Sequence, residues 1–325
     1  MSPIFETVAL PQWPVGGADP TTVRSAIDRW VRSDAVAGLV RCFGGTAPSG
    51  TADEALAQLV AFSAAWDYRG GALERGEIQV LEYSQEIGEI VNAAVLALGL
   101  SGRERPSSTR YDHVLVLGGG ARSALARPDF AARLLRGGVE APAVSALSSL
   151  RKLEDPEIGL AASFGMPGIA FEADTMAAGM VRAFAADAAP VRREGATGEG
   201  EPWWTLTYTA SGRTLSVIAA ASTTPGRRAN TADTLTGWAE LVHTPAGTDR
   251  LLVVTTDLFV PFQHADSVRL LGLRYGCGVE TVGLATDDYT RWLRPNTHTA
   301  LLQEVRSSIL AMNRLAEACL EPSAR

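Results

Sequence analysis

Between Tyr111 and Arg122, an uninterrupted apolar run leads directly into three glycines and an arginine. The residues from Val114 to Leu117 are β-branched or aliphatic without polar alternation, which is typical of a central strand covered on both faces. The three glycines let the backbone turn and present N–H groups, and the arginine adds a charge that can hold an anion. The segment predicts a buried strand that ends in an anion-binding turn, with a plain strand-to-helix connection as the alternative.

This glycine turn departs from the known phosphate-binding fingerprints. Gly118 and Gly120 fit the first two glycines of the dinucleotide motif, but Ser123 occupies the third place. The basic residue of a Walker P-loop is also missing from its position. The turn therefore predicts an anion-binding site but does not identify which anion it binds.

The composition excludes several classes of function. The 325 residues carry a net charge of −7 without a lysine- or arginine-rich stripe, so a nucleic-acid partner is not expected. The three cysteines are far apart and outside any CxxC pattern, so neither a disulfide framework nor a zinc site is predicted. The N-terminus lacks signal-peptide features and no stretch approaches the ~20 apolar residues of a membrane span. We therefore expect a cytoplasmic protein without a membrane partner.

The pattern of the chain changes near residue 105. Before it, helices are predicted after the Asp19 cap, over Asp53–Trp66 and from about Leu73 to Leu98. We interpret residues 1–105 as a helical region packed on the body. Residues 106–325 are interpreted as a Rossmann-like α/β domain that ends in a C-terminal helix.

After residue 110, strand-like and helix-like segments alternate, which predicts an α/β fold with a doubly wound, mainly parallel sheet. Alternation about Ser211-Gly212 predicts an inserted β-hairpin over Trp203–Val217, after an exposed loop at 192–202. Helical spacing predicts the last helix over Thr297–Cys319. The predicted strands are His113–Leu117, Ala141–Ala146, Gly168–Phe171, Leu215–Ala221, Leu251–Thr255 and Val279–Leu284.

Two polar segments follow predicted strands, where open α/β sheets carry their sites. In the first, Asn230 or Thr231 can cap a helix, with Asp233 as the acidic partner of a capping box. Capping explains these residues without a ligand. It does not explain Arg227 and Arg228, which lie beside the positive end of that helix and suit an anion.

In the second segment, a buried strand ends at Thr255, Thr256 and Asp257. These side chains can hold a ligand hydroxyl or merely close a turn. His264 follows, but the chain has no G-x-S-x-G elbow and no hydrolase triad is supported, so a structural or surface histidine is the stronger interpretation. No pair of histidines has metal-ligand spacing, so no metal is predicted.

The order of these motifs resembles the SanA/YdcF/ElyC-like family over roughly residues 111–284. The resemblance rests on VLGGGAR, on Arg127 shortly after it, on the N-T-x-x-T helix start at Asn230, and on LLVVTT with a proline six residues beyond Thr255. It implies a doubly wound Rossmann-like fold and a pocket for a phosphate-bearing or nucleotide-like ligand, S-adenosylmethionine being associated with one branch. Where the family has a histidine and an arginine after the threonines, this chain has Phe259 and Phe262. The family's membrane anchor is also missing, which disfavours a cell-envelope role.

Three hypotheses of function follow. The first is a transferase or hydrolase acting on a phosphorylated or nucleotide-like anion. The second is a non-catalytic nucleotide or S-adenosylmethionine binder. The third is an interaction protein that uses the N-terminal helices and the Trp203/Trp204 hairpin, with a homodimer as one form of it. The candidate acid/base groups are Asp257, Glu172 and His264. The candidate ligand-binding residues are Gly118, Gly119, Gly120, Arg122, Arg127, Arg228, Asn230, Thr231, Thr255 and Thr256.

Overall fold

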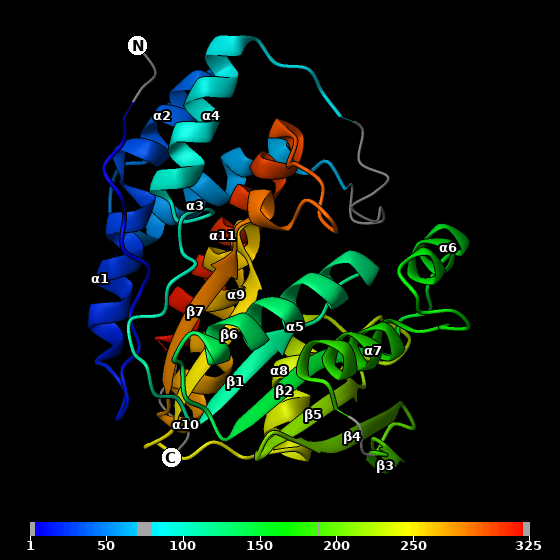
Figure 1. Ribbon diagram of the computed structural model, residues 1–325. Helices are drawn as coiled ribbons and strands as arrows, with labels where there is room; N and C mark the ends of the chain where they lie inside the picture. The colour runs from blue at the N-terminus through cyan, green and yellow to red at the C-terminus, as the bar shows by residue number, and fades with distance from the viewer. Residues whose placement is uncertain (1–3, 70–79, 187–188, 321–325) are drawn as a thin grey trace.

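The computed structural model describes residues 4–69, 80–186 and 189–320 (Figure 1). Its seven-stranded sheet has the order β3-β4-β5-β2-β1-β6-β7. The strands are β1 (His113–Leu117), β2 (Ala143–Ser149), β3 (Val191–Ala196), β4 (Pro202–Ala210), β5 (Arg213–Ala220), β6 (Arg250–Thr256) and β7 (Gly278–Leu284). β3 pairs antiparallel with β4, and β4 pairs antiparallel with β5. The other five strands, β5, β2, β1, β6 and β7, run parallel to one another. The predicted α/β fold with a mainly parallel sheet is confirmed.

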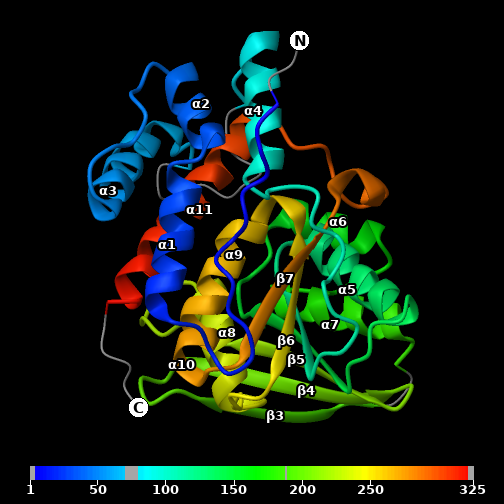
Figure 2. The same cartoon turned by 90° about the vertical axis from the view of Figure 1, so that its left-hand side faces the viewer.

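The parallel strands wind outward from β1 in both directions, as in doubly wound folds. Helices α5 (Ala121–Arg136) and α7 (Glu172–Phe184) pack on one face, and α8 (Thr231–Leu241) and α9 (Val260–Ser267) pack on the other. Figure 2 shows these two helical layers with the sheet between them. The order of the sheet reverses between β1 and β6, so their carboxyl ends form the switch point at which such folds bind ligands.

Residues of β1 are buried on both faces, as its unbroken apolar run predicts. Val114 and Val116 belong to the core under α5 and α7. Leu115 and Leu117 belong to the core on the opposite face. Because burial of apolar surface stabilises a fold by about 25 cal/mol per Å², β1 contributes to stability on both faces.

The N-terminal helices are α1 (Pro20–Val31), α2 (Asp34–Cys42), α3 (Ala52–Phe62) and α4 (Gln85–Ala97). Three of them, α1, α3 and α4, pack on α11 (His298–Ala318), and α2 packs on α4; all four share one apolar core with α9 and α11. The predicted cap of α1 is confirmed, because Asp19 Oδ1 accepts from Thr21 N at 2.9 Å and a proline follows. The division near residue 105 stays a prediction. No helix in the described residues is long and apolar enough to cross a membrane.

Three segments differ from the sequence prediction. Gly168–Phe171 forms no strand; Phe171 makes only an isolated bridge to Lys152 and then begins α7. The predicted loop at 192–202 contains the edge strand β3, whose side chains are all exposed, so no apolar alternation marked it. The helix predicted from Leu73 begins at Gln85, because the Ser84 hydroxyl caps it there. The first part of that prediction, 73–79, lies outside the described residues. Helix α2 was missed.

The hairpin prediction is confirmed. β4 and β5 pair from Trp204↔Ala219 to Ala210↔Arg213 around a two-residue turn. Ser211 has φ +52° and Gly212 has φ +74°, the two positive values of a type I′ turn. The short elements that complete the chain are α6 (Asp155–Ser163), α10 (Leu273–Tyr275), η1 (Ser63–Trp66), η3 (Asp257–Phe259), η4 (Val268–Gly272) and η5 (Thr286–Tyr289).

Candidate functional site

The glycine turn lies at the switch point and leads directly into α5. Gly118 has no space for a side chain, because a Cβ there would lie 2.5 Å from the carbonyl oxygen of Leu147 and 3.0 Å from Glu172 Oε1. Neither Gly119 nor Gly120 has a positive φ, so close packing rather than left-handed backbone explains the turn. Among the described residues, no side chain caps the N-terminus of α5. Its first-turn amides are therefore available to an anion.

Arg127 is buried in the second turn of α5 and links the carboxyl ends of β1 and β6 by hydrogen bonds. Its guanidinium donates to the carbonyl oxygens of Leu117 and Gly118 and, at 3.1 Å, to Thr256 Oγ1. It also lies over the Phe259 ring, 5.4 Å from the centroid. Arg127 and Thr256 therefore bond to each other and to the protein rather than offering these groups to a ligand.

The end of β6 is joined to the start of α8. The Thr255 hydroxyl donates to Gln263 Oε1, and Gln263 Nε2 donates to Thr231 Oγ1 at 3.4 Å. The structure therefore brings the glycine turn, the Asn230–Thr231 helix start and the threonines of β6 to one edge of the sheet, as predicted. Gln263 was not singled out by the sequence, because nothing in the local pattern marks it.

Asn230 and Asp233 form the predicted capping box of α8. Asn230 Oδ1 accepts from Ala232 N at 2.8 Å, and Asp233 Oδ2 accepts from Asn230 N at 2.7 Å. The Arg227 guanidinium contacts both carboxylate oxygens of Asp233, at 2.8 and 3.0 Å. Burial raises the pKa of Asp233, but the bonds from Thr223, Asn230 and Arg227 outweigh it and hold the pKa below its usual value. Arg227 is therefore an internal ion-pair partner.

Glu172 is the most enclosed carboxylate beside the glycine turn, with 7% of its side chain exposed. Its Oε2 lies 2.9 Å from Arg151 Nε and 3.7 Å from Arg228 Nη2, and its Oε1 accepts from Ser148 Oγ at 3.3 Å. Arg151 also grips both oxygens of Glu157, at 2.5 and 2.7 Å.

The sequence analysis missed Arg151 and Glu157. No motif surrounds them, and Arg151 gains its significance only because β2 ends next to β1. Burial raises the pKa of Glu157, but the Arg151 guanidinium more than offsets this and holds the pKa below its ordinary value. A carboxylate and guanidinium network thus borders the uncapped end of α5.

Arg122 lies in the first turn of α5 and reaches across to the segment after η5. Its Nη1 donates to the Trp292 carbonyl oxygen at 2.6 Å, and its guanidinium lies 5.8 Å from the Phe164 ring centroid. Burial, with a smaller effect of Arg294, lowers the pKa of Arg122 from its usual value. Arg122 therefore stands close to a helix end that is already positive.

The other two candidate acid/base groups are tied into the fold. Buried Asp257 accepts from Leu258 N at 2.7 Å and from Thr286 N and Oγ1 at 3.2 and 3.0 Å. Burial raises the pKa of Asp257 above its usual value. The structure does not bring His264 to this edge: its Nδ1 lies 3.0 Å from Thr281 Oγ1, and its Nε2 donates to the Pro11 carbonyl oxygen at 2.7 Å.

Comparison with known proteins gives relatives over nearly the whole chain. The uncharacterized proteins Rv3785 of Mycobacterium tuberculosis and Mb3814 of Mycobacterium bovis are each 34% identical to it over 329 residues. Each alignment covers 91% of this chain and 90% of the relative. The chain belongs to the Rv3785 family. The model of the Rv3785 N-terminal domain matches residues 15–99, and no solved structure matches the chain.

The match to the Rv3785 N-terminal domain covers α1 to α4, and the switch-point residues lie after it. The family model therefore ends before the glycine turn, whereas the alignments to the relatives extend over nearly the whole chain. The comparisons name no activity for the helical segment or for the α/β part.

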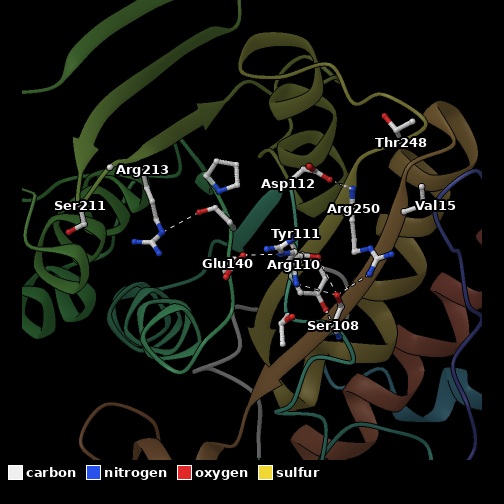
Figure 3. Close-up of a pocket in the computed structure, with 14 residues that line it drawn as sticks. Val15, Ser108, Arg110, Tyr111, Asp112, Glu140, Ser211, Arg213, Thr248 and Arg250 are labelled. Carbon is white, nitrogen blue, oxygen red and sulfur yellow. Dashed lines mark hydrogen bonds and ion pairs between the residues drawn. The ribbon is translucent and has the colours of Figure 1, made fainter.

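A hollow of about 800 Å³ lies at the opposite, amino-terminal edge of the sheet (Figure 3). Its arginines are already engaged: Arg110 pairs with Glu140 at 3.0 Å, and Arg250 Nη1 donates to Ser108 Oγ at 2.9 Å. The hollow is open, and it is remote from the glycine turn. For an anion we favour the carboxyl edge, because uncapped helix amides and arginines meet there.

Proposed function

We propose that this chain is a small-molecule enzyme, of transferase or hydrolase type, that binds a phosphorylated or nucleotide-like anion at the carboxyl edge of its sheet. One observation carries the proposal: the N-terminus of α5, uncapped by any described side chain, follows a glycine turn at the switch point of a doubly wound sheet. Helix amides and the helix dipole together favour negative charge at that position.

The arginines near this helix end support the same ligand class. A guanidinium in the first turn adds like charge to the positive end of α5, which is unfavourable by a few tenths to ~1 kcal/mol without an anion. Arg122 occupies that turn, and Arg228 stands on the β2 side, beside Glu172. A phosphate between them would exchange this repulsion for charged hydrogen bonds of ~1.5–3 kcal/mol each.

Glu172 is assigned the proton-transfer role. Its Oε1 lies against the glycine turn, and its one hydrogen bond from a described residue is the long 3.3 Å contact from Ser148 Oγ, so that oxygen can meet a ligand proton. Asp257 is less suited, because both of its carboxylate oxygens already accept hydrogen bonds from Leu258 and Thr286. His264 is disfavoured by its burial away from this edge.

The non-catalytic binder is the second candidate, and the ion pairs of Glu172 favour it. The Oε2 of Glu172 is paired with Arg151 at 2.9 Å, which suits a carboxylate that holds neighbouring arginines in place. The ligand could be a nucleotide or S-adenosylmethionine. The SanA/YdcF/ElyC-like relationship remains part of this proposal, supported by the convergence of its motif residues at one edge.

The interaction-module hypothesis finds less support. Trp204 is 6% exposed beneath Arg192, and Trp203 packs against Gly195 of the neighbouring strand β3. We also propose a cytoplasmic location, because the half-buried thiols of Cys42 and Cys319 are free, which suits a reducing compartment.

The test is binding, followed by turnover. Native mass spectrometry of the freshly purified full chain should reveal a retained anion, and calorimetry with ATP, AMP, S-adenosylmethionine and inorganic phosphate should rank the ligands. Arg122→Gln should weaken the best of these ~10–100-fold. The control is Arg136→Gln, at the exposed far end of the same helix, which should bind like wild type.

Two outcomes would contradict the proposal. If none of the four ligands binds and none is retained, the anion site is wrong. If a ligand binds but Arg122→Gln and Arg136→Gln behave alike, it binds elsewhere. Glu172→Gln separates the candidates: lost turnover with retained binding supports the enzyme, and absence of any turnover in the wild type supports the binder.

A further inference from the structure

Two histidines and an aspartate meet at the amino-terminal edge of the sheet, far from the glycine turn. His113 is the first residue of β1, His243 follows α8, and Asp249 immediately precedes β6. One ligand atom of each lies within 4.8 Å of the other two. The imidazole rings are 4.0 Å apart at their centroids, and His243 Nε2 lies 2.8 Å from Asp249 Oδ2.

The backbone holds these three positions firmly. Asp249 donates to the Ala246 carbonyl at 2.9 Å and accepts from Gly278 N at 2.8 Å, which ties it to β7. His243 N donates to the Trp238 carbonyl at 3.1 Å, at the end of α8. His113 pairs with β2 and β6 on either side. The side chains thus converge from three fixed elements rather than from one mobile loop.

The ligand atoms have few competing partners. Within the described ranges, the two ring nitrogens of His113 have no hydrogen-bond partner. Nδ1 of His243 has none either. The Asp249 carboxylate contacts His243 and the Ala246 amide, and no described lysine or arginine pairs with it. Two imidazoles and a carboxylate that meet without an arginine form a donor set for a cation.

Access is also open. All three side chains are half-buried. The residues that flank them in sequence, Asp112, Thr248 and Arg250, line the 800 Å³ hollow (Figure 3). An ion there would keep a coordination position for water or for a molecule in the hollow, as zinc sites with three protein ligands do.

We infer that His113, His243 and Asp249 bind a divalent transition-metal ion, with Zn²⁺ as the occupant that fits this ligand set. Two imidazoles and one carboxylate suit Zn²⁺, whereas Mg²⁺ and Ca²⁺ prefer oxygen ligands alone. The ion would clamp β1, the end of α8 and the start of β6. The alternative is that the His243 and Asp249 contact merely closes the 243–249 turn. This site is independent of the proposed anion site.

The experiment uses the full chain without a histidine tag, stripped with EDTA. Calorimetric titration with Zn²⁺ should show saturable binding of about one ion per chain, and Mg²⁺ should not compete. Paramagnetic Co²⁺ should quench part of the tryptophan fluorescence, because the Trp238 ring lies 5.5 Å from His113 and 5.8 Å from His243.

Variants locate the site. His243→Ala and Asp249→Asn should each weaken Zn²⁺ on the order of 100-fold, since losing even an outer-shell partner costs 10–100-fold. The matched control is His298→Ala, at the start of α11, which should bind like wild type. Zn²⁺ should raise the Tm of wild type and His298→Ala, and not that of Asp249→Asn. Absence of saturable binding in wild type, or equal affinity in Asp249→Asn, would overturn the inference.

Discussion

Arg127 donates from Nε to the hydroxyl of Thr256 at 3.1 Å, and so bridges the two strands between which the sheet order reverses. Its Nη1 bonds the carbonyl oxygens of Leu117 and Gly118. The Arg127 guanidinium therefore occupies the space between the carboxyl ends of β1 and β6. A ligand at this edge would lie towards β2, beside Glu172, rather than between β1 and β6.

Arg127→Leu should lower the free energy of unfolding by about 2–4 kcal/mol. The substitution removes the guanidinium donor from the buried Leu117 carbonyl, the half-buried Gly118 carbonyl and the Thr256 hydroxyl, and each charged hydrogen bond lost costs ~1.5–3 kcal/mol before relaxation. Urea denaturation measures the change. Wild-type stability in the variant would show that these bonds contribute nothing.

Two helical glycines should respond to alanine with opposite signs. A Cβ at Gly179 of α7 would lie 1.8 Å from the carbonyl oxygen of Ala124 in α5, so Gly179→Ala should destabilise by about 1–3 kcal/mol through overpacking. Gly159 of α6 is exposed and has nothing within 4 Å, so Gly159→Ala should stabilise by about 0.5–1 kcal/mol. Thermal melts of the pair decide. Equal shifts would mean that α5 and α7 can separate at little cost.

The buried histidine predicts a pH dependence of stability. Burial lowers the pKa of His264 from 6.5 to about 4. The unfolded chain therefore binds a proton between these values that the folded chain does not, so stability is full above pH 6.5 and falls as the pH drops to 4. The loss is up to about 3 kcal/mol.

His264→Gln is the variant for this prediction, because its amide can still donate to the Pro11 carbonyl. Stability measured against pH in EDTA should show a shallower slope than wild type. Part of the slope should remain, since burial also lowers the pKa of His113 to about 4. An unchanged slope would assign the acid sensitivity to other groups.

Neighbouring arginines should separate stability from binding. Arg227→Gln should cost about 1 kcal/mol of stability and leave anion affinity unchanged, because its guanidinium is paired with Asp233 and partly exposed. Arg228→Gln should weaken an anionic ligand about 10-fold. Calorimetry and melting curves on both variants are the measurement, and the reverse pattern would move the ligand to the α8 side.

Sequence patterns anticipated the elements whose signals are local. The apolar run of β1, the turn at Ser211-Gly212 and the capping box at Asn230 each depend on a few adjacent residues, and each is found in the structure. The convergence at the carboxyl edge also followed, because parallel strands end on the same side. β3 escaped because an exposed edge strand buries no alternate side chains.

The parts that could not be predicted depend on pairs that are distant along the chain. Arg127 reads as a ligand-binding charge in sequence, and only its burial against Thr256 shows a structural bond. Glu172 pairs with Arg151 because β2, which Arg151 follows, lies next to β1 in the sheet. His113 and Asp249 are separated by most of the α/β part, so linear spacing of histidines carried no sign of their meeting.

Helix α11 completes the core of α1, α3 and α4, which sets the order in which this chain can mature on the ribosome. The first helices emerge long before the last one, on the order of 10 s earlier at ~5–20 residues per second. During that interval, the apolar faces around Trp30 and Leu59 have no permanent cover. Until α11 emerges, the nascent N-terminal region therefore offers apolar surface to chaperones, and slower translation would lengthen that interval.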